Sequence, residues 1–290
     1  MTTLESRLEY AGTRDRFYDY CRWEYTPAVG WRGKFRSVNL LYHSFDAAGW
    51  GEEAYMFVRA LREGFGAGRT VWGVKWRGGE LSWEFYVYDY RRRERRRSIS
   101  RFLEILRPFA SCRIRPNENL PYFMFSVDVT PALLAGTQPL ERVHMYIGNP
   151  GSSVSSGICY ALEEDRTRLE NVYFFFDTER HIEDAAAKAA CSAHLDTTVL
   201  DAQAVFRPGL TRCRTLCVAN KQENDCIYFS RIDVDQLLLF LREMSYPSVL
   251  AGFVEEHRTE LDHLLYDVGF DYRMAGGGLE VLKSGYYGFF

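Results

Sequence analysis

The residues best suited to chemistry alternate with large apolar residues in short stretches of the sequence. In residues 81–88 apolar residues occupy every second position, and residues 142–147 follow the same pattern. Successive side chains of a β-strand point to opposite faces, so each stretch would present one apolar face and one polar, aromatic face. The side chains on the polar, aromatic faces are Ser82, Glu84, Tyr86, Tyr88, Arg142, His144 and Tyr146. We expect the apolar faces to pack against helices and the other faces to line an interior space.

Further stretches place basic, acidic and aromatic residues on the same kind of face. They contribute Gly73, Lys75, Ser126, Asp128, Asn171, Tyr173, Asp177, Lys221, Tyr228, Arg273 and Lys283. Charged donors of this kind stabilise the concentrated negative charge of a leaving diphosphate. Tyrosine rings attract a carbocation and exclude the water that would quench it. Glu84 could accept the proton of a nucleophile or orient it.

Alternation alone leaves a second interpretation open. The polar faces could point to solvent in a half-exposed sheet, with the tyrosines as amphipathic surface cover. Aromatic residues make up 16% of the chain, which suits an interior that receives large apolar or aromatic ligands. Composition of this kind indicates a ligand but does not decide between the two interpretations.

The elements that must position these residues are five pairs of short strands. The first pair turns at Arg77-Gly78-Gly79-Glu80, where the glycines can supply the positive φ of a tight hairpin. Parallel neighbours would need long crossovers, so pairs this close in sequence are antiparallel. The predicted pairs are 70–76 with 81–88, 122–129 with 142–147, 157–162 with 171–177, 214–219 with 225–231, and 269–274 with 279–287.

Segments with helical spacing separate the strand pairs. They cover residues 52–63, 98–106, 182–194 and 233–267, and the last is broken at Pro247, which disfavours helix for the residue before it. Asp233 and Ser248 are the expected N-caps. Closing the strands into a ring, with the helices outside, would remove exposed strand edges. We therefore expect a single α+β domain over residues 1–290, a ten-stranded antiparallel β-barrel of five β-hairpins surrounded by α-helices.

Charge and hydropathy argue against several classes of protein. The net charge of −3 and the pI near 6.1 give no global attraction for nucleic acid or for an anionic membrane. No stretch approaches the roughly 18 apolar residues that a membrane span needs, and residues 1–20 carry charges where a signal peptide would be apolar. We expect a cytoplasmic protein with no nucleic-acid or membrane partner. The seven cysteines lack zinc-type spacing, so reduced and mostly buried thiols are predicted.

Residues 91–97 form the most conspicuous block of charge, with six arginines around Glu94. A solvated helix start is the first interpretation, because the block lacks interleaved aromatic residues and belongs to an acidic protein. A docking site for an acidic leader or carrier peptide is the alternative.

Several segments resemble the ABBA aromatic prenyltransferases, above all their peptide-modifying cyanobactin branch. The plan of that family is five antiparallel hairpins interleaved with helices. The strongest local similarity is the run Val205-Phe206-Arg207-Pro208-Gly209-Leu210-Thr211-Arg212, followed after a strand by Cys226-Ile227-Tyr228-Phe229. Residues 142–146 and the C-terminal run Lys283-Ser284-Gly285-Tyr286-Tyr287 are similar as well, and residues 71–88 resemble the first hairpin of bacterial small-molecule members. The resemblance covers most of residues 68–290 as a pattern.

The resemblance implies a prenyltransferase that moves a dimethylallyl or geranyl group from its diphosphate onto a nucleophilic, preferably aromatic, side chain of a ribosomal peptide. The implied diphosphate-binding residues are Lys75, Arg142, His144, Arg212, Lys221, Tyr228 and Lys283. The implied prenyl and acceptor pocket consists of Tyr86, Tyr88, Tyr146, Tyr173 and Tyr287. The partners are then a prenyl diphosphate donor and a peptide or aromatic acceptor. Mg2+ held jointly by the diphosphate and one carboxylate is an optional cofactor, although the sequence lacks aspartate clusters.

The sequence departs from the family plan at two places. Residues 149–156, rich in Gly and Ser, stand where the plan has a helix, so either a helix is missing or the stretch is a mobile lid. The cyanobactin branch has a glutamate on its first strand, whereas residues 71–75 contain none. Glu84, on the partner strand, is the predicted catalytic residue in its place. Two other functions stay open: prenyl transfer to an aromatic small molecule, and a non-catalytic barrel that binds an apolar ligand.

Overall fold

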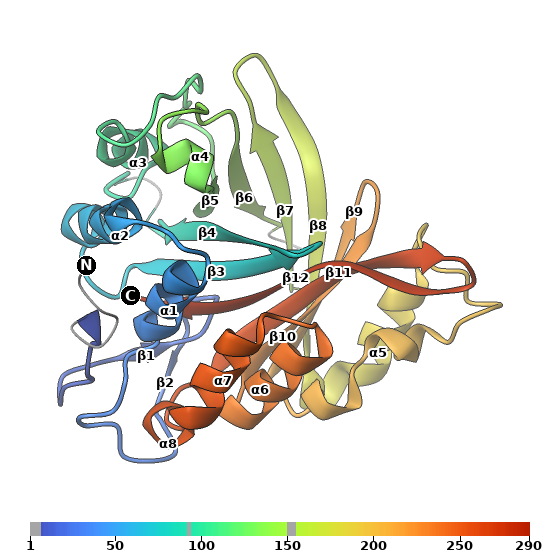
Figure 1. The fold of residues 1–290 in the computed structure, drawn as a ribbon. Helices are drawn as coiled ribbons and strands as arrows, with labels where there is room; N and C mark the ends of the chain where they lie inside the picture. Colours follow the sequence, from blue (N-terminus) through green and yellow to red (C-terminus); the bar gives the residue numbers. More distant parts are fainter. Residues whose placement is uncertain (1–6, 92–93, 150–154) are drawn as a thin grey trace.

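Ten strands close into a barrel in the computed structural model, which describes residues 7–91, 94–149 and 155–290 (Figure 1). Each strand pairs antiparallel with the next one along the chain, and the last pairs with the first. The strands are β3 (Thr70–Arg77), β4 (Glu80–Tyr88), β5 (Met124–Val129), β6 (Val143–Gly148), β7 (Ser155–Leu162), β8 (Thr167–Asp177), β9 (Thr215–Lys221), β10 (Asp225–Ile232), β11 (Tyr266–Ala275) and β12 (Gly278–Phe289). The five predicted hairpins are therefore confirmed.

Helices lie around the outside of the barrel (Figure 1). They are α1 (Val38–Ala47), α2 (Glu52–Phe65), α3 (Ile99–Leu106), α4 (Pro131–Leu134), α5 (Thr178–Ala190), α6 (Val234–Glu243), α7 (Ser248–Glu256) and α8 (Arg258–Leu261). The predicted fold class, a ten-stranded antiparallel β-barrel surrounded by α-helices, is confirmed. Among the described residues, no helix is long and apolar enough to cross a membrane.

The outward faces of the strands form the core beneath these helices. On β4, the side chains of Trp83, Phe85 and Val87 are fully buried in that core. Trp83 donates its indole N–H to the hydroxyl of Ser44 on α1 at 2.8 Å and stacks on Trp50 with 4.0 Å between ring centroids. Burial of these apolar faces is what holds the helices on the barrel. The intervening residues of β4 face the lumen, as the alternation predicts.

The structure corrects several helix boundaries. Helix α1 is missing from the prediction because it is buried over most of its surface and so lacks a polar face. Helix α5 begins before the predicted range because Asp177 caps it, accepting a hydrogen bond from the amide of Glu179. The predicted range 233–267 also extends too far, since β11 already begins at Tyr266.

The two predicted N-caps have different outcomes. Asp233 caps α6 in a full capping box, in which its side chain accepts from the amide of Gln236 and the Gln236 side chain accepts from the Asp233 amide. The predicted cap Ser248 is wrong, because Ser248 is the first residue of α7 and Pro247 is the cap. The break near Pro247 is nevertheless present.

The arginine block does not start a helix, because α3 begins at Ile99 with Ser98 as its cap. Arg92 and Arg93 lie outside the described residues. Arg95 turns inward, where its guanidinium lies 3.3 Å from the Asp89 carboxylate and donates to backbone carbonyls of residues 118, 120 and 122. This one member of the block is a structural residue. The Gly- and Ser-rich stretch 149–156 also lies mostly outside the described residues.

An N-terminal segment covers one end of the barrel with a small hairpin of β1 (Phe17–Tyr18) and β2 (Glu24–Tyr25). Tyr20, in the turn of this hairpin, donates its amide to Asp267 on β11 at 2.8 Å. The Tyr20 ring lies 5.0 Å from the ring of Tyr86 and 5.2 Å from that of Tyr287. The segment therefore reaches into the lumen and forms the floor of the barrel.

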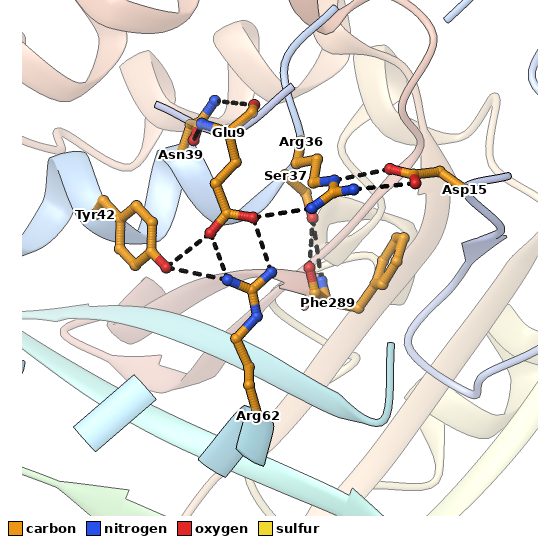
Figure 2. Close-up of polar contacts among 8 residues, drawn as sticks. All are labelled: Glu9, Asp15, Arg36, Ser37, Asn39, Tyr42, Arg62 and Phe289. Atoms are coloured by element: carbon orange, nitrogen blue, oxygen red, sulfur yellow. Dashed lines mark hydrogen bonds and ion pairs between the residues drawn. The ribbon is translucent and has the colours of Figure 1, made fainter. Parts of the chain in front are cut away.

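A partly buried ion-pair network fixes this N-terminal segment to the helices (Figure 2). The carboxylate of Glu9 accepts hydrogen bonds from Arg62 on α2, from Arg36 and from the Tyr42 hydroxyl on α1. Burial raises the pKa of Glu9, but these hydrogen bonds and the Arg62 charge outweigh it and lower the pKa below its usual value. Arg36 also forms two hydrogen bonds with Asp15. These ion pairs thus attach the N-terminal segment, which forms the floor, to the helices outside the barrel.

Candidate active site

A cavity of about 430 Å3 occupies the end of the lumen near the β3–β4 and β9–β10 turns. Its lining combines cations, carboxylates and tyrosine hydroxyls. The basic residues are Lys75, Arg77, Arg142, His144, Arg168, Lys221 and Lys283, and the acidic residues are Glu84, Asp128, Glu170, Glu223 and Asp271. The polar faces of the strands therefore line an interior space, and the interpretation of a half-exposed sheet is wrong. We call this space the charged cavity.

Lys75 is the centre of one cluster in the charged cavity. Its ammonium pairs with the Glu84 carboxylate and lies 2.7 Å from Oδ1 of Asp128. Glu84 also accepts hydrogen bonds of 2.5 Å from the hydroxyls of Tyr86 and Ser126. Both carboxylate oxygens of Glu84 are therefore engaged, Oε2 by Lys75 and Tyr86 and Oε1 by Ser126.

The charge states in this cluster follow from its geometry. Burial lowers the pKa of Lys75, but Asp128 and Glu84 outweigh it and raise the pKa well above the usual value. Burial raises the pKa of Asp128, but Lys75 and His144 outweigh it and lower the pKa to about 2. Burial lowers the pKa of His144 despite the opposing carboxylates. At neutral pH the cluster thus has a cationic lysine beside a neutral imidazole, and both can donate to phosphate oxygens.

A second cluster pairs two lysines with one carboxylate. Lys221 donates to Asp271 at 2.7 Å, and Lys283 lies 3.5 Å from the other oxygen of Asp271. Burial lowers the pKa of Lys283, and the charges of Lys75 and Lys221 lower it further. Lys283 is thus the most weakly paired of the three lysines. An anion placed among the three ammonium groups would relieve their repulsion.

Two arginines lie at the mouth of the charged cavity. Arg142 pairs with Glu163 at 2.7 Å, and Arg168 pairs with Glu170 at 2.6 Å. Both arginine side chains are more than one third exposed, so their ion pairs contribute little and the side chains can turn toward an entering anion.

Five tyrosines form a closed ring across the lumen, one from every second strand. They are Tyr86 on β4, Tyr146 on β6, Tyr173 on β8, Tyr228 on β10 and Tyr287 on β12. Neighbouring ring centroids are 5.9 to 6.4 Å apart all the way around. This tyrosine ring presents aromatic faces to the lumen beside the three lysines. It is an environment that stabilises a carbocation and excludes water.

Small residues on the intervening strands make room for the tyrosine ring. Each stands directly opposite a tyrosine in the strand pairing: Gly73, Ser126, Cys159, Ala219 and Gly269 face Tyr287, Tyr86, Tyr146, Tyr173 and Tyr228 respectively. A Cβ atom on Gly73 would lie only 2.6 Å from the ring of Tyr287. The alternation of large and small residues around the barrel is therefore required by space.

A second, smaller space lies on the other side of the tyrosine ring. It measures about 80 Å3 and shares four tyrosines with the charged cavity. Its remaining lining is mostly apolar and comes from the opposite strand ends and from the hairpin turn of the N-terminal segment: Tyr20, Cys21, Trp23, Phe123, Met124, Ser156, Gly157, Phe175, Thr215, Cys217, Ser230 and Asp267. We call it the apolar chamber.

One group among the described residues has the composition of a metal site. Ligand atoms of Glu84, Asp128 and His144 lie within 4.8 Å of one another. The Lys75 ammonium already bonds both carboxylates, however, and Mg2+ prefers six oxygen ligands. These residues therefore do not fit a resident magnesium ion as they stand, and we derive no step through one. Magnesium that enters with the diphosphate stays a prediction.

Most predicted site residues converge on the charged cavity. Those that line it are Lys75, Glu84, Tyr86, Arg142, His144, Tyr146, Tyr173, Lys221, Tyr228, Lys283 and Tyr287. Arg212 lies elsewhere, because it precedes β9, is 78% exposed and faces Asp233 at 3.7 Å. Tyr88 is buried under the floor, where its hydroxyl bonds the Tyr20 carbonyl. Arg273 pairs with Glu280 at 2.8 Å outside the cavity.

Sequence reasoning misses several residues that line the charged cavity or its floor. Asp271 pairs with Lys221 and Lys283, and alternation along β11 could have placed it in the lumen. Arg168 and Glu170 precede the predicted strand start at residue 171, whereas β8 begins at Thr167. Tyr20 carries no signal in the sequence, because it belongs to a turn.

Comparisons with known proteins give limited support. No family model matches the chain, and no curated protein matches it. Among solved structures, 6-dimethylallyltryptophan synthase from Micromonospora olivasterospora, in complex with DMASPP and Trp, is similar with a TM-score of 0.49 and 10% sequence identity. The match covers 86% of this chain and 95% of that one. A similarity of this size carries no inference about activity, so the activity proposed below rests on the geometry of this chain.

Proposed function

We propose that this protein is a prenyltransferase, which transfers a dimethylallyl or geranyl group from its diphosphate to an aromatic nucleophile. The observation that supports this proposal most is that a group of lysines and the tyrosine ring lie next to each other in one lumen. Lys75, Lys221 and Lys283 lie on one side, each beside a carboxylate that a diphosphate would replace as its partner, and the tyrosine ring lies directly beside them. A ligand with an anionic head and an allylic tail meets both environments at once.

The chemistry follows from this arrangement. The bond between C1 of the prenyl group and the diphosphate oxygen breaks, and the electron pair leaves with the diphosphate. The lysines stabilise that negative charge, and the tyrosine faces stabilise the allylic cation that remains. The nucleophile then bonds to C1 and loses its proton to a carboxylate or to the departing diphosphate. No water is consumed, which is why the site must exclude it.

Glu84 is the proposed proton acceptor, with Lys75 controlling its availability. In the structure the Glu84 carboxylate is bonded by Lys75, Tyr86 and Ser126. A diphosphate that attracts Lys75 would leave one Glu84 oxygen without its cation and free to accept a proton from the nucleophile. This order of events would delay the general base until the donor is bound.

The proposed acceptor is an aromatic side chain of a ribosomal peptide, and an aromatic small molecule is the alternative. The likeness of residues 205–229 to the cyanobactin branch favours the peptide. The charged cavity of about 430 Å3 is compatible with both. We propose the diphosphate contacts Lys75, His144, Lys221, Tyr228 and Lys283, with Arg142 at the mouth.

Release of inorganic diphosphate from dimethylallyl diphosphate tests the reaction without knowledge of the acceptor. Phosphorus NMR would follow release by the wild type, with and without a pool of aromatic peptides and phenols, and mass spectrometry would detect any prenylated product. We expect release that rises with the correct acceptor and falls at least about 100-fold in a Lys75→Ala, Lys221→Ala double variant. Lys34→Ala, which removes a surface ion pair with Asp262, is the matched control. Tight donor binding without any release would instead favour the non-catalytic barrel.

A further inference from the structure

A further cavity lies at the floor end of the molecule, among the N-terminal segment, α1, α2 and the end of β12. It measures about 280 Å3, and its lining comes from residues 14–18, 36–38, 62, 67–69, 264, 289 and 290. None of these residues lines the charged cavity or the apolar chamber. The proposed reaction therefore gives this cavity no role.

Arginines line this cavity in excess over carboxylates, and we call it the arginine cavity. The lining arginines are Arg14, Arg16, Arg36, Arg62 and Arg69, whereas Asp15 is the only acidic side chain among the described lining residues. Three of the arginines have carboxylate partners, in the pairs Arg16–Glu24, Arg36–Asp15 and Arg62–Glu9. No ion pair joins Arg14 or Arg69 to a carboxylate anywhere in the part of the chain that the structure describes. These two guanidinium groups are therefore available to an anion.

Two further arginines add positive charge at the rim of the cavity. Arg22 donates to the carbonyl of Gly68, and its guanidinium lies 4.4 Å from the centre of the Tyr18 ring. Its positive φ of 63° persists only because the surrounding structure fixes it. Burial lowers the pKa of Arg22, and the charges of Arg69 and Arg97 lower it further. Arg22, Arg69 and Arg97 thus repel one another, and an anion beside Arg69 would relieve that repulsion.

We propose that the arginine cavity binds a small phosphate monoester with one flat apolar group, and that Arg14 and Arg69 hold its phosphate. A guanidinium donates two parallel hydrogen bonds to a phosphate in a fixed geometry. A dianion compensates two unpaired arginines, which a single carboxylate does not. The volume lies near the lower end of the range for small-molecule sites, roughly 300 Å3, so the organic part of the ligand is small.

Apolar side chains form much of the remaining wall and select for the organic part of the ligand. They are Phe17, Tyr18, Val38, Leu264, Phe289 and Phe290. The rings of Tyr18 and Phe289 meet edge to face with 5.7 Å between centroids, and Arg36 and Arg62 share the Glu9 carboxylate beside Phe289 (Figure 2). Inorganic phosphate would leave this wall in contact with water, whereas an apolar ring would cover it.

The position of the arginine cavity makes the proposal independent of the proposed function. Arg14 belongs to the N-terminal segment that forms the floor, Arg69 precedes β3, and Phe289 ends β12. A ligand that contacts all three would link the floor to two strands of the barrel. It would do so without touching any residue that lines the charged cavity.

Titration with phenyl phosphate, phenol and inorganic phosphate tests the proposal, because these three probes separate the phosphate from the ring. Two-dimensional NMR would follow the backbone amide signals of Gly68, which lines the arginine cavity, and of Gly285, which lines the charged cavity. We expect phenyl phosphate to shift the Gly68 signal. From that signal, it should bind at least about 10-fold more tightly than phenol or inorganic phosphate.

Variants assign the binding to the arginines. Arg14→Gln, Arg69→Gln should weaken binding of phenyl phosphate at least about 10-fold, and because both side chains are exposed, its other amide signals should stay in place. The matched control is Arg101→Gln, Arg273→Gln, which loses the same charge from surface pairs with Glu104 and Glu280 and should bind like the wild type. The Lys75→Ala, Lys221→Ala variant should keep the Gly68 response, since its changes lie in the charged cavity.

Several results would overturn the proposal. The Gly68 signal could fail to shift with phenyl phosphate, or the Arg14→Gln, Arg69→Gln variant could bind as tightly as the wild type. Loss of the Gly68 response in the Lys75→Ala, Lys221→Ala variant would mean that the probe binds in the charged cavity instead. Equal affinity for phenyl phosphate and inorganic phosphate would contradict the ligand class, because the apolar wall would then contribute nothing.

Discussion

At the scale of single residues, pairing decides which lumen cations can receive a diphosphate. Lys75 and Lys221 each lie 2.7 Å from a carboxylate, whereas Lys283 lies 3.5 Å from an Asp271 that Lys221 already uses. A diphosphate offers more charge and more acceptor oxygens than a carboxylate. We therefore expect Lys283 to bind the donor first, and the two paired lysines to exchange partners afterwards.

The buried Asp267 makes stability depend on pH. Its pKa is about 7 in the folded protein against 3.8 for the ordinary group, so the folded state binds the proton more tightly than the unfolded state. Its favourable contribution is complete below pH 3.8 and is lost as the pH rises through 7. Asp267→Asn, which is neutral at every pH, should therefore gain stability relative to the wild type as the pH rises from 5 to 8, by about 2 to 3 kcal/mol.

Urea unfolding of both proteins at several pH values checks this expectation. The groups that face Asp267 are Asp19, Arg231, Tyr20, Cys21, Tyr25, Tyr88, Cys213 and the Ser230 hydroxyl. Asp19 is the one whose removal should reduce the effect. A stability difference between Asp267→Asn and the wild type that does not change with pH would contradict the assignment.

At the scale of elements, the strands build the tyrosine ring because large and small lumen residues alternate from one strand to the next. The tyrosines come from β4, β6, β8, β10 and β12, and the residues opposite them on the odd strands have at most a short side chain. The tyrosine ring closes only if the residues opposite the tyrosines stay small.

Gly73→Ala should displace the tyrosine ring without opening the barrel. The new Cβ would lie 2.6 Å from Tyr287, so that ring must move away from its neighbours. We expect a loss of about 1 to 3 kcal/mol in the free energy of unfolding, typical of overpacking, and at least about 10-fold slower diphosphate release. Gly148→Ala on β6 is the matched control, because its Cβ would meet open space. Unchanged release by Gly73→Ala would show that the ring has no part in catalysis.

The alternation pattern explains how much of the site the sequence predicts. It places Lys75, Glu84 and His144 in the lumen because a strand has only two faces. It cannot place Tyr20, which reaches the lumen from a turn that pairs with nothing in the barrel. The resemblance of a short segment, rather than alternation, predicts that Arg212 binds the diphosphate. The structure instead places Arg212 on the surface.

The same reasoning explains the limits at strand ends. Tyr88 lies on the same face of β4 as Tyr86 but beyond the tyrosine ring, under Tyr20. Alternation along a strand predicts which face of the sheet a side chain points to. Its position along the barrel axis depends on the strand register and on the segment that covers that end of the barrel. Helix α1 is missed because a buried helix has no polar face to reveal its period.

At the scale of the whole molecule, the barrel has two ends of opposite character. The hairpin-turn end contains the cations and carboxylates of the charged cavity, and the other end contains the apolar chamber and the floor formed by the N-terminal segment. With a net charge of −3 over the entire chain, attraction of an anion must come from the charged cavity itself. Donor binding should therefore depend on the lumen lysines far more than on surface charge.

Calorimetric titration with dimethylallyl thiolodiphosphate, a donor mimic that does not react, tests this central claim most directly. It would be carried out with and without magnesium on the wild type, Lys283→Ala, the Lys75→Ala, Lys221→Ala double variant and the surface control Lys34→Ala. We predict roughly micromolar binding by the wild type and the control, weakened at least about 10-fold in both lumen variants, as expected for loss of charge-assisted hydrogen bonds. No binding by the wild type under either condition, or equal binding by all four proteins, would contradict a diphosphate site in the barrel.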